Sequence, residues 1–158
     1  MRLFIVGLAG LLVAAPAWAA TPKEKDVLAP VSTFAEAFNK GQQSYPEDVF
    51  TEDAVVVDGF APFVWSGRNG AREWYGDLMG RTAQAHEAFM ALHYHLRLGG
   101  PQISRVEGDK AYVVLPGVNH WRDKAGAHFE KANWAITLRH TDKGWRITSH
   151  SWAVVAAR

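Results

Sequence analysis

The sequence has 158 residues, no cysteine and a formal net charge of +1, because 17 Lys and Arg stand against 16 Asp and Glu. A charge this close to zero argues against nucleic acid or an anionic membrane surface as a partner. The lack of cysteine excludes disulfides and a cysteine-linked lipid anchor.

The N-terminus predicts a secretory signal peptide over residues 1–19. Arg2 precedes an apolar run over residues 3–15, and Ala17-Trp18-Ala19 provides an Ala-x-Ala cleavage site. The run is shorter than the roughly 20 apolar residues that a membrane span needs, although an uncleaved anchor is the alternative. We expect a periplasmic or secreted protein, free of the membrane after cleavage, whose residues 20–158 form a single domain.

The first half of this domain predicts mainly helices. The expected segments are a helix from residue 26 or 32 to 40, a strand over 54–57, an aromatic-rich loop over 59–66 and a helix over 68–92. Gly76 and Gly80 weaken the middle of the second helix.

From residue 92 the hydrophobic period changes from 3.6 to 2, which indicates strands. Strands separated by turn residues are expected over residues 92–98, 102–107, 111–122, 128–140 and 145–155. Helices followed by an antiparallel meander predict a two-layer α+β domain, with the helices on one face of a curved sheet.

Asp58 is the first candidate functional residue, because it directly follows the apolar strand over residues 54–57. A carboxyl group at the end of a buried strand can open onto a cavity, where burial raises its pKa toward useful basicity. The alternative is a turn residue, since Asp-Gly after a strand is an ordinary turn signal.

Three groups of residues carry a family resemblance: Phe50-x-x-Asp53-Ala54, Ser66-Gly67 with Glu73-Trp74-Tyr75, and Gly144-Trp145-Arg146-Ile147. With their order and spacing, residues 26–154 resemble the nuclear transport factor 2-like (NTF2-like) superfamily, which includes ketosteroid isomerases and SnoaL-like polyketide cyclases. The resemblance implies a cone-shaped α+β fold, with N-terminal helices packed on a strongly curved antiparallel sheet of four to six strands. It also implies a homodimer.

Asp58 falls where the ketosteroid isomerases keep their catalytic base, so the resemblance implies a role in proton transfer on an enolising ketone. The family's hydroxyl donors are largely missing, because two of its Tyr positions fall at Phe34 and Phe50 and only Tyr75 remains. Since losing an oxyanion donor can cost on the order of a hundredfold in rate, we do not expect steroid isomerisation by the familiar mechanism.

His120 and Tyr75 are the candidate catalytic partners of Asp58. The family register places His120 toward the cavity with Tyr112 and Val114, although a register error of one residue would turn it to solvent. The residues expected to line a ligand site are Phe34, Trp65, His95 and Trp134.

A metal site is the weaker alternative. His93 and His95 project from one face of a strand and could chelate zinc or copper with a third ligand such as His150. No acidic partner for these imidazoles is evident in the sequence, so the favoured prediction has no metal and no cofactor.

Two classes of function remain open. One is a cofactor-independent acid/base enzyme of isomerase, cyclase or hydrolase type, using Asp58 on a small apolar molecule. The other is a non-catalytic ligand-binding or dimeric assembly domain, because one fold can serve many functions.

Overall fold

The computed structural model describes residues 22–158, so the predicted signal peptide lies outside the described residues. Three helices and seven strands make up this part of the chain, in the order α1 (Pro22–Asn39), β1 (Phe50–Val57), β2 (Val64–Trp65), α2 (Gly70–Met79), α3 (Ala83–Ala91), β3 (His95–Leu98), β4 (Ile103–Glu107), β5 (Lys110–Asp123), β6 (Gly126–Thr141) and β7 (Gly144–Ala157). None of these helices is long and apolar enough to cross a membrane.

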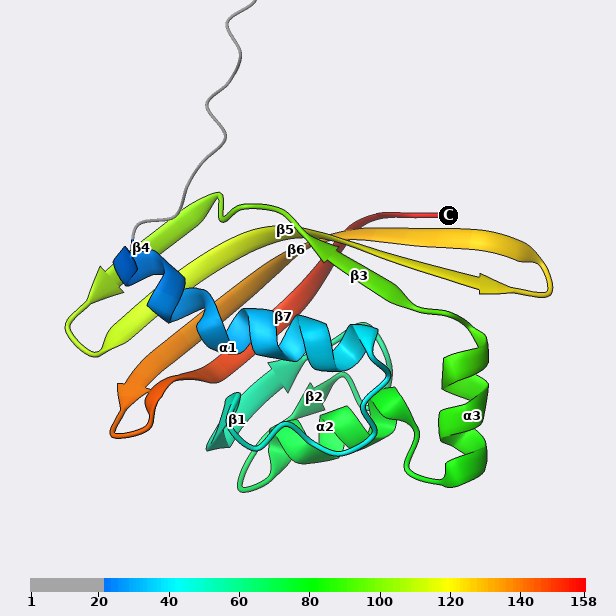
Figure 1. Ribbon diagram of the computed structural model, residues 1–158, viewed down its shortest axis with the longest axis horizontal. Helices are drawn as coiled ribbons and strands as arrows, with labels where there is room; N and C mark the ends of the chain where they lie inside the picture. The colour runs from blue at the N-terminus through cyan, green and yellow to red at the C-terminus, as the bar shows by residue number, and fades with distance from the viewer. Residues whose placement is uncertain (1–21) are drawn as a thin grey trace, which may run out of the picture.

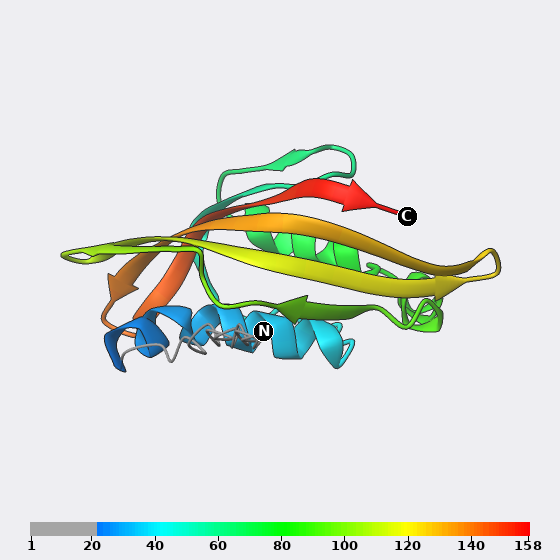
Figure 2. The same cartoon turned by 90° about the horizontal axis from the view of Figure 1, so that it is seen from above.

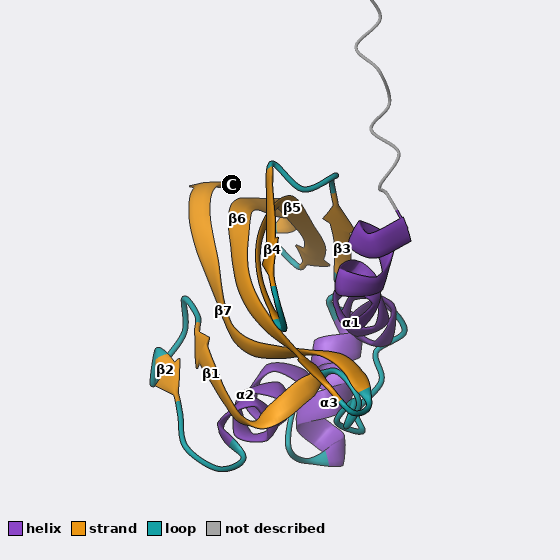
Figure 3. Cartoon of the chain, turned by 90° about the vertical axis from the view of Figure 1, so that its left-hand side faces the viewer, coloured by secondary structure: helices purple, strands orange, loops and turns teal. Residues whose placement is uncertain are grey.

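All seven strands belong to one sheet, with the order β2-β1-β7-β6-β5-β3 and with β4 also paired to β5. The long strands β5, β6 and β7 form two antiparallel hairpins, as the turn signals predicted. The sheet curves strongly, and its concave side faces the helices (Figures 1, 2 and 3). This confirms the predicted α+β architecture.

The sheet differs from the prediction in its size, with seven strands instead of four to six, and in one pairing. β1 runs parallel to β7, with Val55 opposite Ser149 and Val57 opposite Ser151, so the sheet is mixed rather than antiparallel throughout. The reason is topological: α2, α3 and five strands separate β1 from β7 in the chain, so no hairpin dictates their relative direction. The spacing of residues in the sequence does not predict this parallel pairing.

Helix α1 covers the concave face because one of its sides is apolar. Val27, Val31, Phe34 and Phe38 recur every three to four residues and are at most 5% exposed. At the end of the helix, the side chain of Asn39 donates to the carbonyl of Leu96 at 2.9 Å and accepts from its N–H at 2.7 Å. These two bonds tie the helix to the short edge strand β3.

The predicted helix over residues 68–92 is two helices, α2 and α3, with a break at Gly80. Gly80 has φ 84°, and a Cβ there would lie 2.5 Å from the backbone nitrogen of His86. Only glycine takes this conformation without strain. At this break the chain changes direction, so that α3 runs across the direction of α2 (Figure 1).

Strand β7 contains an irregularity that changes which side chains face the helices. Leu138 of β6 pairs with Ile147, but Thr137 pairs with Ser149, so Thr148 is an extra residue. Such a β-bulge breaks the alternation of side chains. Trp145 and Ile147 before the bulge and His150 after it are therefore all buried, although their numbers differ in parity.

Candidate active site

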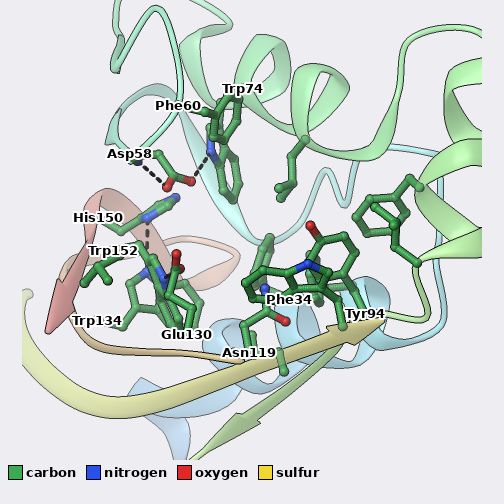
Figure 4. Close-up of a pocket in the computed structure, with 18 of the residues that line it drawn as sticks. Phe34, Asp58, Phe60, Trp74, Tyr94, Asn119, Glu130, Trp134, His150 and Trp152 are labelled. Carbon is green, nitrogen blue, oxygen red and sulfur yellow. Dashed lines mark hydrogen bonds between the residues drawn. The ribbon is translucent and has the colours of Figure 1, made fainter. Parts of the chain in front are cut away.

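A cavity of about 560 Å³ lies between the helices and the concave face of the sheet (Figure 4). Its walls are mostly aromatic and aliphatic, and a few polar side chains enter it. The residues that line it include Phe34, Asp58, Trp74, Asn119, Glu130, Trp134, His150 and Trp152.

Asp58 stands at the end of β1 with both carboxylate oxygens engaged. The indole N–H of Trp74 donates to Oδ2 at 2.8 Å, and the backbone N–H of Gly59 donates to Oδ1 at 2.6 Å. Burial raises the pKa of Asp58 above its usual range, and the hydrogen bonds from Trp74 and Gly59 only partly offset this effect. The carboxylate is thus held in one orientation and made more basic.

His150 is 4% exposed and packs against the rings of Phe50, Trp74 and Trp134. The indole N–H of Trp134 donates to its Nδ1 at 3.0 Å, and the Trp74 ring stands edge-on to it with a centroid distance of 4.6 Å. Burial lowers the pKa of His150 to about 3. The imidazole is therefore neutral at physiological pH.

Glu130 on β6 gives a third example of the same arrangement, since it accepts a hydrogen bond from the indole N–H of Trp152 on β7. The Trp152 ring reaches this position because β5 carries Gly117 beneath it, where a Cβ would lie 2.6 Å from the ring. A tryptophan N–H can only donate. Asp58, His150 and Glu130 are thus each held by an indole N–H that can donate a hydrogen bond but cannot accept one.

This arrangement can bind and deprotonate a small organic molecule. The aromatic walls favour apolar ligands, the Asp58 carboxylate can accept a proton, and a neutral imidazole can donate a hydrogen bond. Within residues 22–158 no group of three His, Asp or Glu side chains is placed to hold a metal ion. The proposed trio of His93, His95 and His150 is therefore not brought together.

Three of the predicted site residues meet in the cavity: Asp58, Phe34 and Trp134. Tyr75 and Trp65 do not line it. Tyr75 is 1% exposed and its hydroxyl donates to the carbonyl of Gln42, while burial raises its pKa to about 12. Trp65 donates to Asp77 at 3.0 Å and packs on Phe60.

His120 and His95 lie opposite each other on β5 and β3 and are exposed on the outer side of the sheet. Their neighbours Asn119 and Leu96, which are also paired, line the cavity instead. The predicted face of β5 is thus wrong by one residue. Hydrophobicity could not fix the face, because Tyr112 to Val118 includes apolar residues of both parities.

Glu130, Trp74 and Trp152 were missed as site residues, and His150 was considered only as a third metal ligand. One signal was present in the sequence: the aromatic and apolar positions of the last strand change from odd numbers at Trp145 and Ile147 to an even number at Trp152. Such a change of parity within one strand indicates a bulge. It would have placed His150 on the inner face.

Comparison with solved structures shows the same fold in proteins of low sequence identity. An NTF2-like protein with a cystatin-like fold from Novosphingobium aromaticivorans matches with a TM-score of 0.66 and 21% identity over 83% of this chain and 80% of its own. A type 2 hexachlorocyclohexane dehydrochlorinase matches with a TM-score of 0.68 and 11% identity over 86% and 87%. The CaMKII hub of S. rosetta matches with a TM-score of 0.64 and 15% identity over 90% and 98%.

No curated protein matches the sequence. The model of the SnoaL-like domain matches residues 20–151, which is most of the chain. With the α+β fold and the cavity between helices and sheet, this match identifies the chain as a member of the SnoaL-like domain family.

Proposed function

We propose that this protein is an exported acid/base enzyme that binds a small, mainly apolar molecule in the cavity and uses Asp58 as its general base. The observation that carries the proposal is the Asp58 carboxylate, held by Trp74 and Gly59 at the wall of an aromatic cavity, with a pKa raised by burial. The proposed chemistry is a proton transfer and needs no cofactor.

The surroundings of Asp58 fit this role on two counts. A general base works best when its pKa lies near the working pH, and burial moves Asp58 in that direction. The bonds to Trp74 and Gly59 fix the carboxylate, so that little reorganisation is needed when a proton arrives. Among the solved structures with this fold, one is a hexachlorocyclohexane dehydrochlorinase, an enzyme on a compact apolar substrate.

The test uses 2-tetralone, a bicyclic ketone with acidic C–H groups beside its carbonyl. In D2O, wild-type protein should exchange these hydrogens for deuterium faster than buffer does, as followed by NMR. Asp58→Asn should lower the enzyme-dependent rate by about 10²–10⁴-fold, the usual contribution of a general base, and should leave the affinity for 2-tetralone nearly unchanged.

Asp53→Asn is the matched control, because Asp53 lies on the same strand but is largely exposed beside Arg139. This variant should catalyse the deuterium exchange of 2-tetralone at the wild-type rate. Equal rates in wild type and Asp58→Asn would refute Asp58 as the base. Absence of binding by 2-tetralone and by related apolar carbonyl compounds, judged by thermal stabilisation, would refute the enzyme proposal.

Export is part of the proposal and rests on the sequence of residues 1–19. The full-length protein made in a Gram-negative host should appear in the periplasm or medium with Ala20 as its first residue. N-terminal sequencing of the recovered protein checks the cleavage site. Recovery of uncleaved protein in the membrane fraction would instead support a signal anchor.

A second candidate is a homodimeric assembly domain, which the similarity to the CaMKII hub supports. The outer side of the sheet carries exposed apolar side chains at Ile103 and Tyr112, which are 40% and 41% exposed on neighbouring strands. In this proposal a second copy of the chain covers them. Light scattering should give a dimer mass for wild type, and Ile103→Glu with Tyr112→Glu should give a monomer.

A further inference from the structure

Two buried side-chain polar atoms within residues 22–158 have no hydrogen-bond partner, Nε2 of His150 and Oδ1 of Asn119. Both residues line the cavity described above. An unpaired buried polar group costs about 1–3 kcal/mol, and native proteins leave few of them. That both lie in one cavity indicates that something bound there completes them.

The tautomer of His150 follows from its partner. The Trp134 N–H can only donate, so Nδ1 of His150 must accept and carries no proton. The ring is neutral because it is buried, and a neutral imidazole keeps one proton. That proton must be on Nε2, which makes this atom an unused hydrogen-bond donor.

The unused donor belongs to the same wall of the cavity as Asp58. The Trp74 indole connects the two, since it donates to Asp58 and its ring stands 4.6 Å from that of His150 between centroids. In Figure 4 the free edge of the His150 ring points toward the Asp58 side chain, yet neither a hydrogen bond nor an ion pair joins them. The base, Asp58, and the donor, Nε2–H of His150, are thus placed to contact the same part of a ligand.

We propose that Nε2–H of His150 binds the carbonyl oxygen when the ligand is a ketone or aldehyde with a C–H beside the carbonyl, and so takes the place of the family's missing hydroxyl donors. This inference rests on the proposed function. Asp58 takes the proton from that carbon, the C–H electron pair becomes a C=C bond, and the carbonyl π electrons move to oxygen. His150 stabilises the resulting enolate oxygen by its hydrogen bond, and the proton returns from Asp58 to carbon.

Nε2 is shielded from solvent, so the proposal requires a wall side chain to shift when the ligand makes this contact. Asn119 supplies a second polar point, two strands away on β5. Figure 4 shows it apart from Asp58. A hydroxyl group at the far end of the ligand would satisfy its Oδ1.

The binding test compares 2-tetralone with tetralin, which has the same rings but no oxygen. Wild type should bind 2-tetralone about tenfold more tightly in calorimetry, the size of one well-placed hydrogen bond to a buried donor. His150→Phe should remove this difference while keeping tetralin affinity. His120→Phe, which changes an exposed histidine outside the cavity, should keep it.

The outcomes separate the two proposals. If neither compound binds wild type, both proposals fail for this ligand class. If both bind wild type equally, or if His150→Phe keeps the preference for the ketone, the role of His150 is overturned while ligand binding and Asp58 stand.

A second measurement needs no variant of His150. In ¹⁵N-histidine NMR of wild type, His150 should show a protonated Nε2 and an unprotonated Nδ1. The Nε2 proton should move downfield with 2-tetralone and not with tetralin. A proton on Nδ1, or an Nε2–H signal that the ketone leaves unchanged, would overturn the inference even if His150→Phe does not fold.

Discussion

His120 and His150 lie on β5 and β7, two long strands on either side of β6, but they have opposite environments. His120 lies on β5, whose regular alternation turns it to the outer side while Asn119 and Trp121 face the cavity. His150 lies on β7 after the bulge at Thr148, which turns it inward. The comparison teaches that strand register, and not residue type, decides which histidine can act on a ligand.

The most disruptive way to break this comparison is to delete Thr148. Without the extra residue, regular alternation would turn His150 and Trp152 to the outer side, or Trp145 and Ile147 in their place. Either outcome takes two large side chains out of the core. We expect a loss of more than about 4 kcal/mol in the free energy of unfolding, measured by urea denaturation.

Thr148→Val is the matched control, because it keeps the residue count and removes only the hydroxyl that bonds Thr137 at 2.7 Å. It should cost no more than about 1.5 kcal/mol. A deletion variant as stable as this control would show that the bulge does not set the orientation of His150.

Replacing each histidine by alanine gives the next largest contrast. His150→Ala removes a buried ring and leaves the Trp134 N–H without its acceptor, so we expect a loss of about 2–4 kcal/mol in unfolding free energy. His120→Ala affects an exposed side chain and should change it by less than about 0.5 kcal/mol. Losses of equal size in urea titrations would contradict the assigned burial.

The burial of His150 should also make the free energy of unfolding depend on pH. Because burial lowers the pKa of His150 to about 3 in the folded state, from about 6.5 in an unfolded chain, the unfolded state binds more protons between these values. Stability is then fully present above pH 6.5 and is lost as pH falls, by about 1.4 kcal/mol between pH 7.5 and 5.5.

Urea titrations at both pH values, in a buffer of constant ionic strength, measure this loss. His150→Gln should lower the wild-type difference between pH 7.5 and 5.5 by about 1.4 kcal/mol, the share assigned to His150. Asp58, the carboxyl on the same wall, has a pKa raised by burial and changes the stability in the opposite direction, so the share of His150 is read from the difference between wild type and His150→Gln. An unchanged pH difference in His150→Gln would show that His150 is protonated in the folded protein.

Asp58→Asn should have the smallest effect on stability and one of opposite sign. Burial disfavours the charged carboxylate, so removing the charge should raise the unfolding midpoint slightly at pH 7, while an amide oxygen can still accept from Trp74. Thermal unfolding of the variant beside Asp53→Asn measures this. A lower midpoint would mean that the hydrogen bonds of the carboxylate outweigh its desolvation.

Much of the fold could be predicted from the sequence because its signals are local. The hairpins at Asp123 and Gly144 and the alternation in β5 to β7 depend on neighbouring residues only. The break at Gly80 was visible as a weak point but not as a helix end. The parallel pairing of β1 with β7 depends on contacts almost 100 residues apart and has no local signature.

The site could be predicted only where local chemistry coincided with a strand end. Asp58 follows an apolar run, which made it a candidate, but Asp-Gly is also an ordinary turn signal, so the resemblance to the ketosteroid isomerases carried its assignment to the pocket. His150 and Glu130 are surrounded by polar and apolar neighbours alike, so their roles arise from Trp134 and Trp152 on paired strands. Those pairings are set by the register of β6 and β7, which hydrophobic pattern alone leaves uncertain by one residue.

The indole partners of the cavity groups also bear on how this site can change over generations. Substituting Asp58 alone by an apolar residue leaves the Trp74 N–H buried and unpaired, and substituting Trp74 alone leaves the carboxylate with less support. The same holds for Trp134 with His150. Such neighbours show non-additive effects, so each pair should be replaced together, and new specificities in this cavity would arise by paired rather than single substitutions.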